Sequence, residues 1–351
     1  MKKLTLLLFA FLSANLALQS CSSDDDGTYT EQIGDYSNGI FVLNEGAMGS
    51  NNAEVTFFKD GVATQNIFKT INPNQNLGNV ATSITFEDNV GYIVVNMSNK
   101  IEVVNAATFA SKGTITSNLN NPRYVAIDNQ NLYVTNWGDA SNPNDDYISV
   151  YKQSDLSFVK KIDVAEGPEQ ILIEKNKLVV AHAGGWNTGS SVSIYNLATN
   201  TLDNIEVGDY PNAIVEENGT VYVLCSGNAW AQNPTAGRLV KLNLETNRIT
   251  QTINFEAGQN PRFLVEENNQ LYYTLDNGIY RLGTQATTLP SQPLFTSNAT
   301  YIYSLNILNN AIYVGDATNF SSNGEVKYYS LTGNLLGSFA TGIGPNFITK
   351  N

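Results

Sequence analysis

The side chains best suited to bind a ligand are three tryptophans and two arginines. Trp137, Trp186 and Trp230 each lie in a loop rich in Gly, Asn and Asp, directly after a strand-like segment. Indole rings beyond strand ends are typical of recognition surfaces, although tryptophan in an all-β chain also packs sheets together. Arg123 and Arg262 each follow a proline, and a guanidinium group binds carboxylate, amide or phosphate groups. We expect these five side chains to form one ligand-binding face.

Residues beside these candidates extend the predicted site. Tyr124 follows Arg123 directly and is expected to line the mouth of the site together with Gln170 and Phe263. Further apolar residues occupy corresponding loops elsewhere in the chain, at Met48 and Phe320. The two arginines can instead bridge neighbouring carboxylates such as Glu169, and the sequence leaves both roles open.

Metal binding and catalysis have little support in the sequence. His182 is the only histidine; we include it among the ligand-binding candidates, although at a strand end a hydrogen-bonded structural role is more common. Asp139, Asp145 and Asp146 share a loop but lack EF-hand spacing, so we expect a solvated acidic loop. No Ser–His arrangement, phosphate loop or metal triad is visible. We therefore predict neither a metal nor a cofactor, and no enzymatic activity.

A repeated strand–turn–strand unit positions these residues. The stretch NPRYVAIDNQNLYVTNWGD at 121–139 is typical of a β-hairpin, and related stretches recur at 167–185, 210–228 and 260–278. The second strand of each unit ends at intervals of 52, 40, 46, 43, 50 and 41 residues, at Asn44, Asn96, Asn136, His182, Cys225, Leu275 and Asp316. Four strands per interval predict an all-β, seven-bladed β-propeller.

The two ends of the chain predict how the ring closes. The first unit lacks the strand with which the other units begin, and the segment GPNFITK at 344–350 matches the missing strand. We expect this last segment to complete blade one of a propeller spanning 38–351, with four-stranded antiparallel blades. An open β-solenoid, which would need no displaced strand, is the alternative.

The long loops of the predicted propeller fall on one face. The loops between the second and third strands of a blade lie on the same face as the start of each innermost strand, which lines the central channel. The three tryptophans belong to consecutive members of this loop set, in blades three, four and five. We therefore expect them to form a contiguous arc, with the arginines at the mouth of the channel.

The N-terminus predicts a lipid anchor. Lys2 and Lys3 precede the apolar run LTLLLFAFL, which indicates a secretory signal over 1–20. The tetrapeptide LQSC resembles the lipobox of bacterial lipoproteins, in which Cys21 is acylated; an ordinary cleaved signal is the alternative. The acidic tether at 21–37 begins with a Ser and Asp run that resembles the lipoprotein export signal of Bacteroidota. We predict an outer-membrane protein that faces the cell exterior.

Charge and cysteine content exclude several partners. Removing 1–20 takes away two lysines and leaves 17 Lys plus Arg against 32 Asp plus Glu, a net charge of −15. Such a surface repels nucleic acid and anionic lipid headgroups, so membrane attachment must come from acyl chains. Cys225 is the only other cysteine, and we expect it to be a small buried residue rather than a reactive thiol.

The LYVTN segment at 132–136 resembles the YVTN-type β-propellers, and the resemblance extends over 38–351. With the lipobox, the chain is similar to the YncE-like surface lipoproteins of Bacteroidota. Some of these, of the BtuG type, capture cobalamin for a TonB-dependent transporter, which implies a soluble ligand such as a corrinoid and a transporter partner. A surface-layer or adhesion role is the alternative, and a lactonase-like hydrolase is the third.

The predicted lipid anchor is testable with two variants. Replacing Cys21 by Ala removes the acylated thiol, so the protein should leave the membrane fraction. Replacing the aspartates at 24–26 by Ala should leave the protein lipidated but facing inward. Digestion of this second variant by protease added to intact cells would contradict the export signal.

Overall fold

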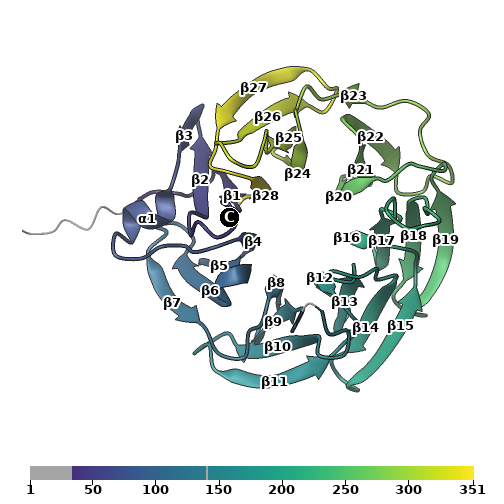
Figure 1. Ribbon diagram of the computed structural model, residues 1–351, viewed down its shortest axis with the longest axis horizontal. Coiled ribbons are helices and arrows are strands. Elements are labelled where there is room, and N and C mark those ends of the chain that lie inside the picture. The colour runs from purple at the N-terminus through teal and green to yellow at the C-terminus, as the bar shows by residue number, and fades with distance from the viewer. Residues whose placement is uncertain (1–33, 140) are drawn as a thin grey trace, which may run out of the picture. The chain divides into compact units, whose positions relative to one another are not determined.

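Seven antiparallel sheets of four strands form a ring in the computed structural model, which describes residues 34–139 and 141–351 (Figure 1). The sheets are the blades of a β-propeller, as the repeat spacing predicts. The predicted signal peptide, Cys21 and most of the predicted tether lie outside the described residues. Within the described chain, no helix has the length and apolar character needed to span a bilayer.

Each blade runs from an innermost strand at the channel to an outermost strand at the rim. Blades 1 and 2 contain β28 (Pro345–Thr349), β1 (Ile40–Asn44), β2 (Glu54–Lys59), β3 (Val62–Thr64) and β4 (Ala81–Glu87), β5 (Val90–Val95), β6 (Lys100–Asn105), β7 (Ser111–Ile115). Blades 3 and 4 contain β8 (Pro122–Ile127), β9 (Asn131–Asn136), β10 (Tyr147–Lys152), β11 (Phe158–Asp163) and β12 (Pro168–Glu174), β13 (Lys177–His182), β14 (Ser191–Asn196), β15 (Thr201–Glu206).

The remaining three blades have the same order. Blades 5 and 6 contain β16 (Pro211–Glu217), β17 (Thr220–Cys225), β18 (Arg238–Asn243), β19 (Arg248–Asn254) and β20 (Arg262–Glu267), β21 (Gln270–Leu275), β22 (Gly278–Gly283), β23 (Phe295–Thr296). Blade 7 contains β24 (Ile302–Leu308), β25 (Ala311–Asp316), β26 (Glu325–Ser330) and β27 (Leu335–Ala340). The predicted ends of the second strands are confirmed in every blade except blade 2, where β5 stops one residue earlier at Val95.

The hydrophobic core is divided among the interfaces between adjacent blades. Seven clusters of buried side chains fill these interfaces, one for each pair of neighbours. The second and third strands are buried along almost their whole length because each is covered by a blade on both sides. The outermost strands are mostly exposed. This distribution explains why the middle strands are continuously apolar in the sequence.

A β-bulge interrupts the first residues of the innermost strand in all seven blades. In β8, Arg123 and Tyr124 together face the single residue Thr135 of β9. A bulge bends its strand and changes the direction of nearby side chains. In β20 the bulged residue Phe263 has a φ of 54°, a conformation that bulky residues adopt only under constraint. The bulges therefore determine the direction in which the side chains that follow the prolines at the start of the innermost strands point relative to the channel.

The last strand closes the ring. β28 pairs antiparallel with β1, so the C-terminal segment completes blade 1 as predicted. Tyr36, in the range assigned to the tether, is buried against Phe57 and Phe109, and its carbonyl accepts a hydrogen bond from Nδ2 of Asn351. The packed part of the chain therefore begins before Asn38.

A chain ending at Gly342 should be much less stable than the complete one. It loses β28, leaves β1 as a free edge and removes the buried Ile348, whose truncation to Ala alone should cost about 2–5 kcal/mol. Thermal unfolding followed by circular dichroism measures the effect, and Lys350→Ala, an exposed change in the same segment, is the control. An unchanged midpoint in the shortened chain would show that closure contributes no stability.

Candidate functional site

A central channel of about 700 Å³ is lined by the innermost strands of all seven blades. Tyr124, Gln170 and Phe263, predicted to line the mouth, all contribute to its wall, and Arg262 does so too. The amide oxygens of Asn212 and Asn346 are buried and accept no hydrogen bond from any described residue. The channel therefore offers polar groups that protein atoms do not satisfy.

Arg123 is held between an acidic side chain and an indole ring. Its Nε lies 3.1 Å from Oε2 of Glu169, and its guanidinium carbon lies 4.2 Å from the ring centroid of Trp137. Burial raises the pKa of Glu169, and the charge of Arg123 opposes that shift. Of the two roles left open for Arg123, the structure assigns the bridge to Glu169. Trp137 is partly buried beneath this pair.

Arg262 has different surroundings, because it belongs to an aromatic cluster. It donates a hydrogen bond of 2.9 Å to the hydroxyl of Tyr301, and its guanidinium carbon lies 4.9 Å from the Phe263 ring. Tyr301, Tyr303 and Phe320 pack against one another, with centroid separations between 4.8 and 6.2 Å. Arg262 forms no ion pair with any described carboxylate, so of the two roles left open for it the structure does not show the bridge to an acidic neighbour.

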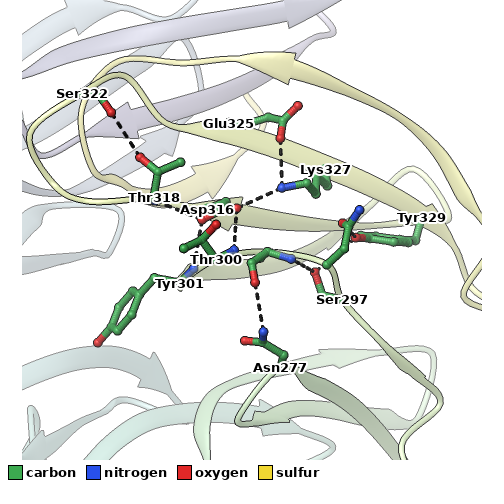
Figure 2. Close-up of polar contacts among 12 residues, drawn as sticks. Asn277, Ser297, Thr300, Tyr301, Asp316, Thr318, Ser322, Glu325, Lys327 and Tyr329 are labelled. Atoms are coloured by element: carbon green, nitrogen blue, oxygen red, sulfur yellow. Dashed lines mark hydrogen bonds and ion pairs between the residues drawn. The ribbon is translucent and has the colours of Figure 1, made fainter.

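The buried carboxylate of Asp316 fixes the segment that carries Tyr301 (Figure 2). It accepts backbone hydrogen bonds from three residues, Thr300, Tyr301 and Thr318. Lys327 lies 2.9 Å from both Asp316 and Glu325, as Figure 2 shows. Burial alone would raise the pKa of Asp316, but these hydrogen bonds outweigh it and hold the pKa below its usual value. The aromatic cluster therefore has a rigid base.

Glu45, directly after β1, joins the two sides of the mouth. Its carboxylate accepts a hydrogen bond from the hydroxyl of Tyr303, and Arg123 is close enough to stabilise its charge. Burial nevertheless raises the pKa of Glu45 above its ordinary value. The mouth thus contains two acidic side chains, Glu45 and Glu169, and two basic ones, Arg123 and Arg262. Of the two arginines, only Arg262 forms no ion pair with a described carboxylate.

Exposed apolar side chains occur in two places only in the described chain. One set occupies the outermost strands. The other lies on the face where the innermost strands begin, at Met48, Met97, Trp186, Trp230, Tyr301 and Phe320. Trp186 and Trp230 are 76% and 93% exposed. We call this surface the loop-rich face; the opposite face also has one long loop, 284–294, between β22 and β23. Of the three tryptophans that were expected to form an arc, Trp186 and Trp230 are therefore exposed and Trp137 is covered.

His182 occupies a structural position that recurs in other blades. The residue that ends the second strand bonds to the third strand through the same pair of positions in four blades: Asn44–Thr56, Asn136–Ser149, His182–Ser193 and Asp316–Lys327. The Nε2 atom of His182 lies 2.7 Å from Oγ of Ser193, and the side chain is 1% exposed. This equivalence gives His182 a structural role, and His182 does not line the channel.

The remaining reactive side chains are also engaged in structure. Asp145 accepts a hydrogen bond from the backbone of Asp139, and the buried Asp146 accepts one from Gly167. Among the described residues, no three His, Cys, Asp or Glu side chains are grouped as metal ligands would be. Cys225 is buried, as predicted, and burial raises the pKa of its thiol to about 12. None of these groups faces the channel.

Tyr301, Tyr303 and Glu45 are site residues that sequence reasoning missed. The innermost strands of blades 2 and 7 begin without the proline that precedes Arg123 and Arg262, so no proline marks Tyr301 or Tyr303 as a channel-entry residue. The segment ATYIYSL at 299–305 holds the signal, because two aromatic residues flank the strand start. Glu45 follows β1 directly, in the loop set already recognised as unusual.

A family model described as "Domain of unknown function (DUF5074)" matches residues 38–329, most of the chain. The chain belongs to the DUF5074 family. No curated protein matches it. For this DUF5074 member, the seven-bladed propeller fold is the property that the structure establishes.

Solved structures similar to this DUF5074 chain share its fold. A quinonprotein alcohol dehydrogenase-like protein from Bacteroides thetaiotaomicron superposes with a TM-score of 0.68 at 17% identity, over 90% of this chain and 78% of the other. The designed protein Ika8 gives 0.56 at 12% identity, over 88% and 90%. Hydrazine synthase of Kuenenia stuttgartiensis gives 0.56 at 15% identity, over 75% and 87%. At these identities the likeness concerns the fold alone.

The buried His182 should make the protein less stable in acid. Burial lowers the pKa of His182 from 6.5 to about 4, so the unfolded chain binds the proton more tightly. The contribution of neutral His182 to the free energy of unfolding is fully present above pH 6.5. It is lost as the pH falls toward 4, by up to about 3 kcal/mol. His182→Gln, which does not titrate, should reduce this loss in denaturant unfolding measured across that range.

Asp146 changes the free energy of unfolding with pH in the opposite direction. Burial raises its pKa to about 7, so its contribution to that free energy is lost as the pH rises toward this value. The informative quantity is therefore the difference between His182→Gln and the parent protein at each pH. A difference that does not change between pH 6.5 and 4 would contradict the burial of a neutral His182.

Proposed function

We propose that this chain is a binding protein that captures a soluble ligand at the channel mouth on the loop-rich face. One combination of observations supports the proposal: exposed aromatic side chains lie on the face where the channel opens, and two amide oxygens in the channel wall lack protein partners. Trp186 and Trp230 expose large apolar rings to water, which a folded protein rarely does without a use for them. Asn212 and Asn346 supply free amide oxygens inside the mouth.

Arg262 is the polar side chain best placed to contact the ligand. Arg123 is paired with Glu169 and stacked on the ring of Trp137, so its charge stabilises the protein itself. The hydrogen bond from Arg262 to Tyr301 uses only one of the five donors of the guanidinium group. The other donors are available for a carboxylate, amide or phosphate group of a ligand.

A large ring system with polar substituents suits this mixture of contacts. The channel volume of about 700 Å³ lies within the range of small-molecule sites, and aromatic rings at the rim extend the contact surface. The resemblance to YncE-like lipoproteins makes a corrinoid the candidate ligand. In the same proposal a lipid on Cys21 holds the protein at the cell surface, where it passes the ligand to a TonB-dependent transporter.

Attachment to another macromolecule is the second candidate function. Trp230 is 93% exposed, and the loop that carries it extends beyond the end of β17. A ring with so little contact to its own protein suits a broad partner surface as well as a small molecule. A surface-layer or adhesion role would use the same face without the channel.

Trp186→Ala should weaken corrinoid binding by about 2 kcal/mol, roughly thirtyfold, because truncating an aromatic anchor removes its stacking surface. Titration calorimetry of residues 28–351 with cyanocobalamin, together with quenching of tryptophan fluorescence, measures the affinity. Arg262→Ala should also reduce affinity. Leu336→Ala removes an exposed apolar side chain from the outer strand β27 and should change nothing, which makes it the matched control.

Three results would separate the parts of this proposal. Absence of heat and of quenching at micromolar cyanocobalamin would exclude the corrinoid. Binding that is unaffected by Trp186→Ala and Arg262→Ala would exclude the mouth as its site. Retained binding of a protein or polysaccharide partner that is lost with Trp230→Ala would favour attachment.

A further inference from the structure

The connection between blades 1 and 2 differs from all others in length and structure. It spans residues 65–80, sixteen residues, whereas the other connections between blades have four to seven. It contains the short helix α1 (Ile67–Ile71), which lies beside β2 (Figure 1). Sequence analysis did not predict this helix. Among the described residues, this insertion is therefore the one long and partly helical connection between adjacent blades.

Buried contacts hold this insertion in place. Ile67 and Phe68 are fully buried in the cluster between blades 1 and 2. The side chain of Asn72 donates to the carbonyls of Phe68 and Phe109 and accepts from the backbone of Ser111. The insertion is thus anchored on both of the blades that it connects, and its exposed polar side chains have a fixed base.

A second cavity, of about 440 Å³, lies between this insertion and blades 1 and 7. We call it the blade-one pocket. It is lined by Ala53, Leu77, Gly342 and Ile343, by Glu54 and Lys69, and by six carboxamides at Asn51, Asn52, Gln65, Asn66, Asn76 and Asn323. Its residues come from four separate segments, and none of them belongs to the channel mouth. It contains no aromatic side chain among these residues.

Glu54 places a buried acceptor at the base of the blade-one pocket. The residue is 9% exposed, and its Oε1 accepts hydrogen bonds of 3.1 Å from Asn44 and from Thr56. Its Oε2 is buried and has no hydrogen-bond partner among the described residues, although the backbone N–H groups of Asn66 and Gly342 lie close enough to the carboxyl group to oppose the rise in its pKa that burial causes. A buried carboxyl oxygen without a donor is costly, so this atom is suited to receive a hydrogen bond from a ligand.

Four of the six carboxamides around the pocket are free to bind, whereas Asn52 accepts from the backbone of Ala47 and Asn76 accepts from Lys69. Across residues 34–139 and 141–351, the side chains of Asn51, Gln65, Asn66 and Asn323 make no hydrogen bond. Lys69, the only basic side chain of the lining, donates to Asn76 at 2.6 Å. Each carboxamide offers donors and an acceptor together, as each hydroxyl group does. This chemistry matches a hydroxyl-rich ligand better than an anion, which would need more than one cation.

We propose that the blade-one pocket binds a small neutral polyhydroxylated ligand, a monosaccharide or disaccharide. A hydroxyl of the ligand donates to Oε2 of Glu54, and the free carboxamides bind the remaining hydroxyls. The volume is within the range of small-ligand sites, and the lack of aromatic rings disfavours flat ligands. The pocket shares no lining residue with the channel, so the protein would have two separate binding sites on the loop-rich face.

Saturation-transfer NMR with glucose, galactose, N-acetylglucosamine, maltose and lactose tests this site. The parent protein should give a signal with at least one of these sugars at millimolar concentration. The double change Gln65→Ala and Asn323→Ala should lower the affinity about tenfold or more, because two exposed partners are lost without disturbing the core. Asn74→Ala, in the same insertion but outside the pocket lining, should leave the affinity unchanged.

Glu54→Gln provides a second measurement, since it retains the shape of the side chain and replaces the carboxylate. It should weaken sugar binding, while its melting temperature reports whether the fold is intact. No signal from any of the five sugars, or a signal that survives the double change, would overturn the proposal. Trp186→Ala should not affect the sugar signal, so failure here and failure of corrinoid capture are distinguishable.

Discussion

The antiparallel pairing between β28 and β1 is the interaction on which the rest of the structure depends. It joins the C-terminal segment to the first strands, so that every blade has a neighbour on both sides and a cluster of buried side chains fills each interface. Closure of the ring gives β1 a paired strand on both sides, as the second strand of every other blade has. It also brings Asn346 into the channel wall and places Glu45 beside Tyr303, 258 residues away in sequence.

Within the closed ring, the bulges determine what the channel mouth presents. Regular alternation along an innermost strand would place consecutive side chains on opposite sides. The bulge in β8 instead sets both Arg123 and Tyr124 against a single residue of β9, and the bulge in β20 holds Phe263 at a positive φ. Equivalent positions then diverge in role: Arg123 is neutralised by Glu169, whereas Arg262 keeps an aromatic environment and free donors.

The repeated architecture separates positions that stabilise the fold from positions that are free to vary. Asn44, Asn136, His182 and Asp316 end equivalent strands and bond to equivalent partners, which explains why chemically different residues there do the same work. The loops beyond these positions carry no such constraint. Exposed aromatic rings and a helical insertion are therefore found there and between blades, where they do not disturb the core.

The sequence by itself determined the number of blades, the order of strands and the strand that closes the ring. These follow from apolar strands and turn residues, which are local patterns repeated seven times. It also located Trp186 and Trp230 in exposed loops. Only the tertiary structure decided that Trp137 is covered by Arg123, that Tyr301 and Glu45 belong to the mouth, and that the insertion at 65–80 forms a pocket with Glu54. The contacts of Tyr301, of Glu45 and of the insertion join residues from different blades, and the contact between Arg123 and Trp137 joins two strands of blade 3 at a bulge. None of these contacts is a local pattern in the sequence.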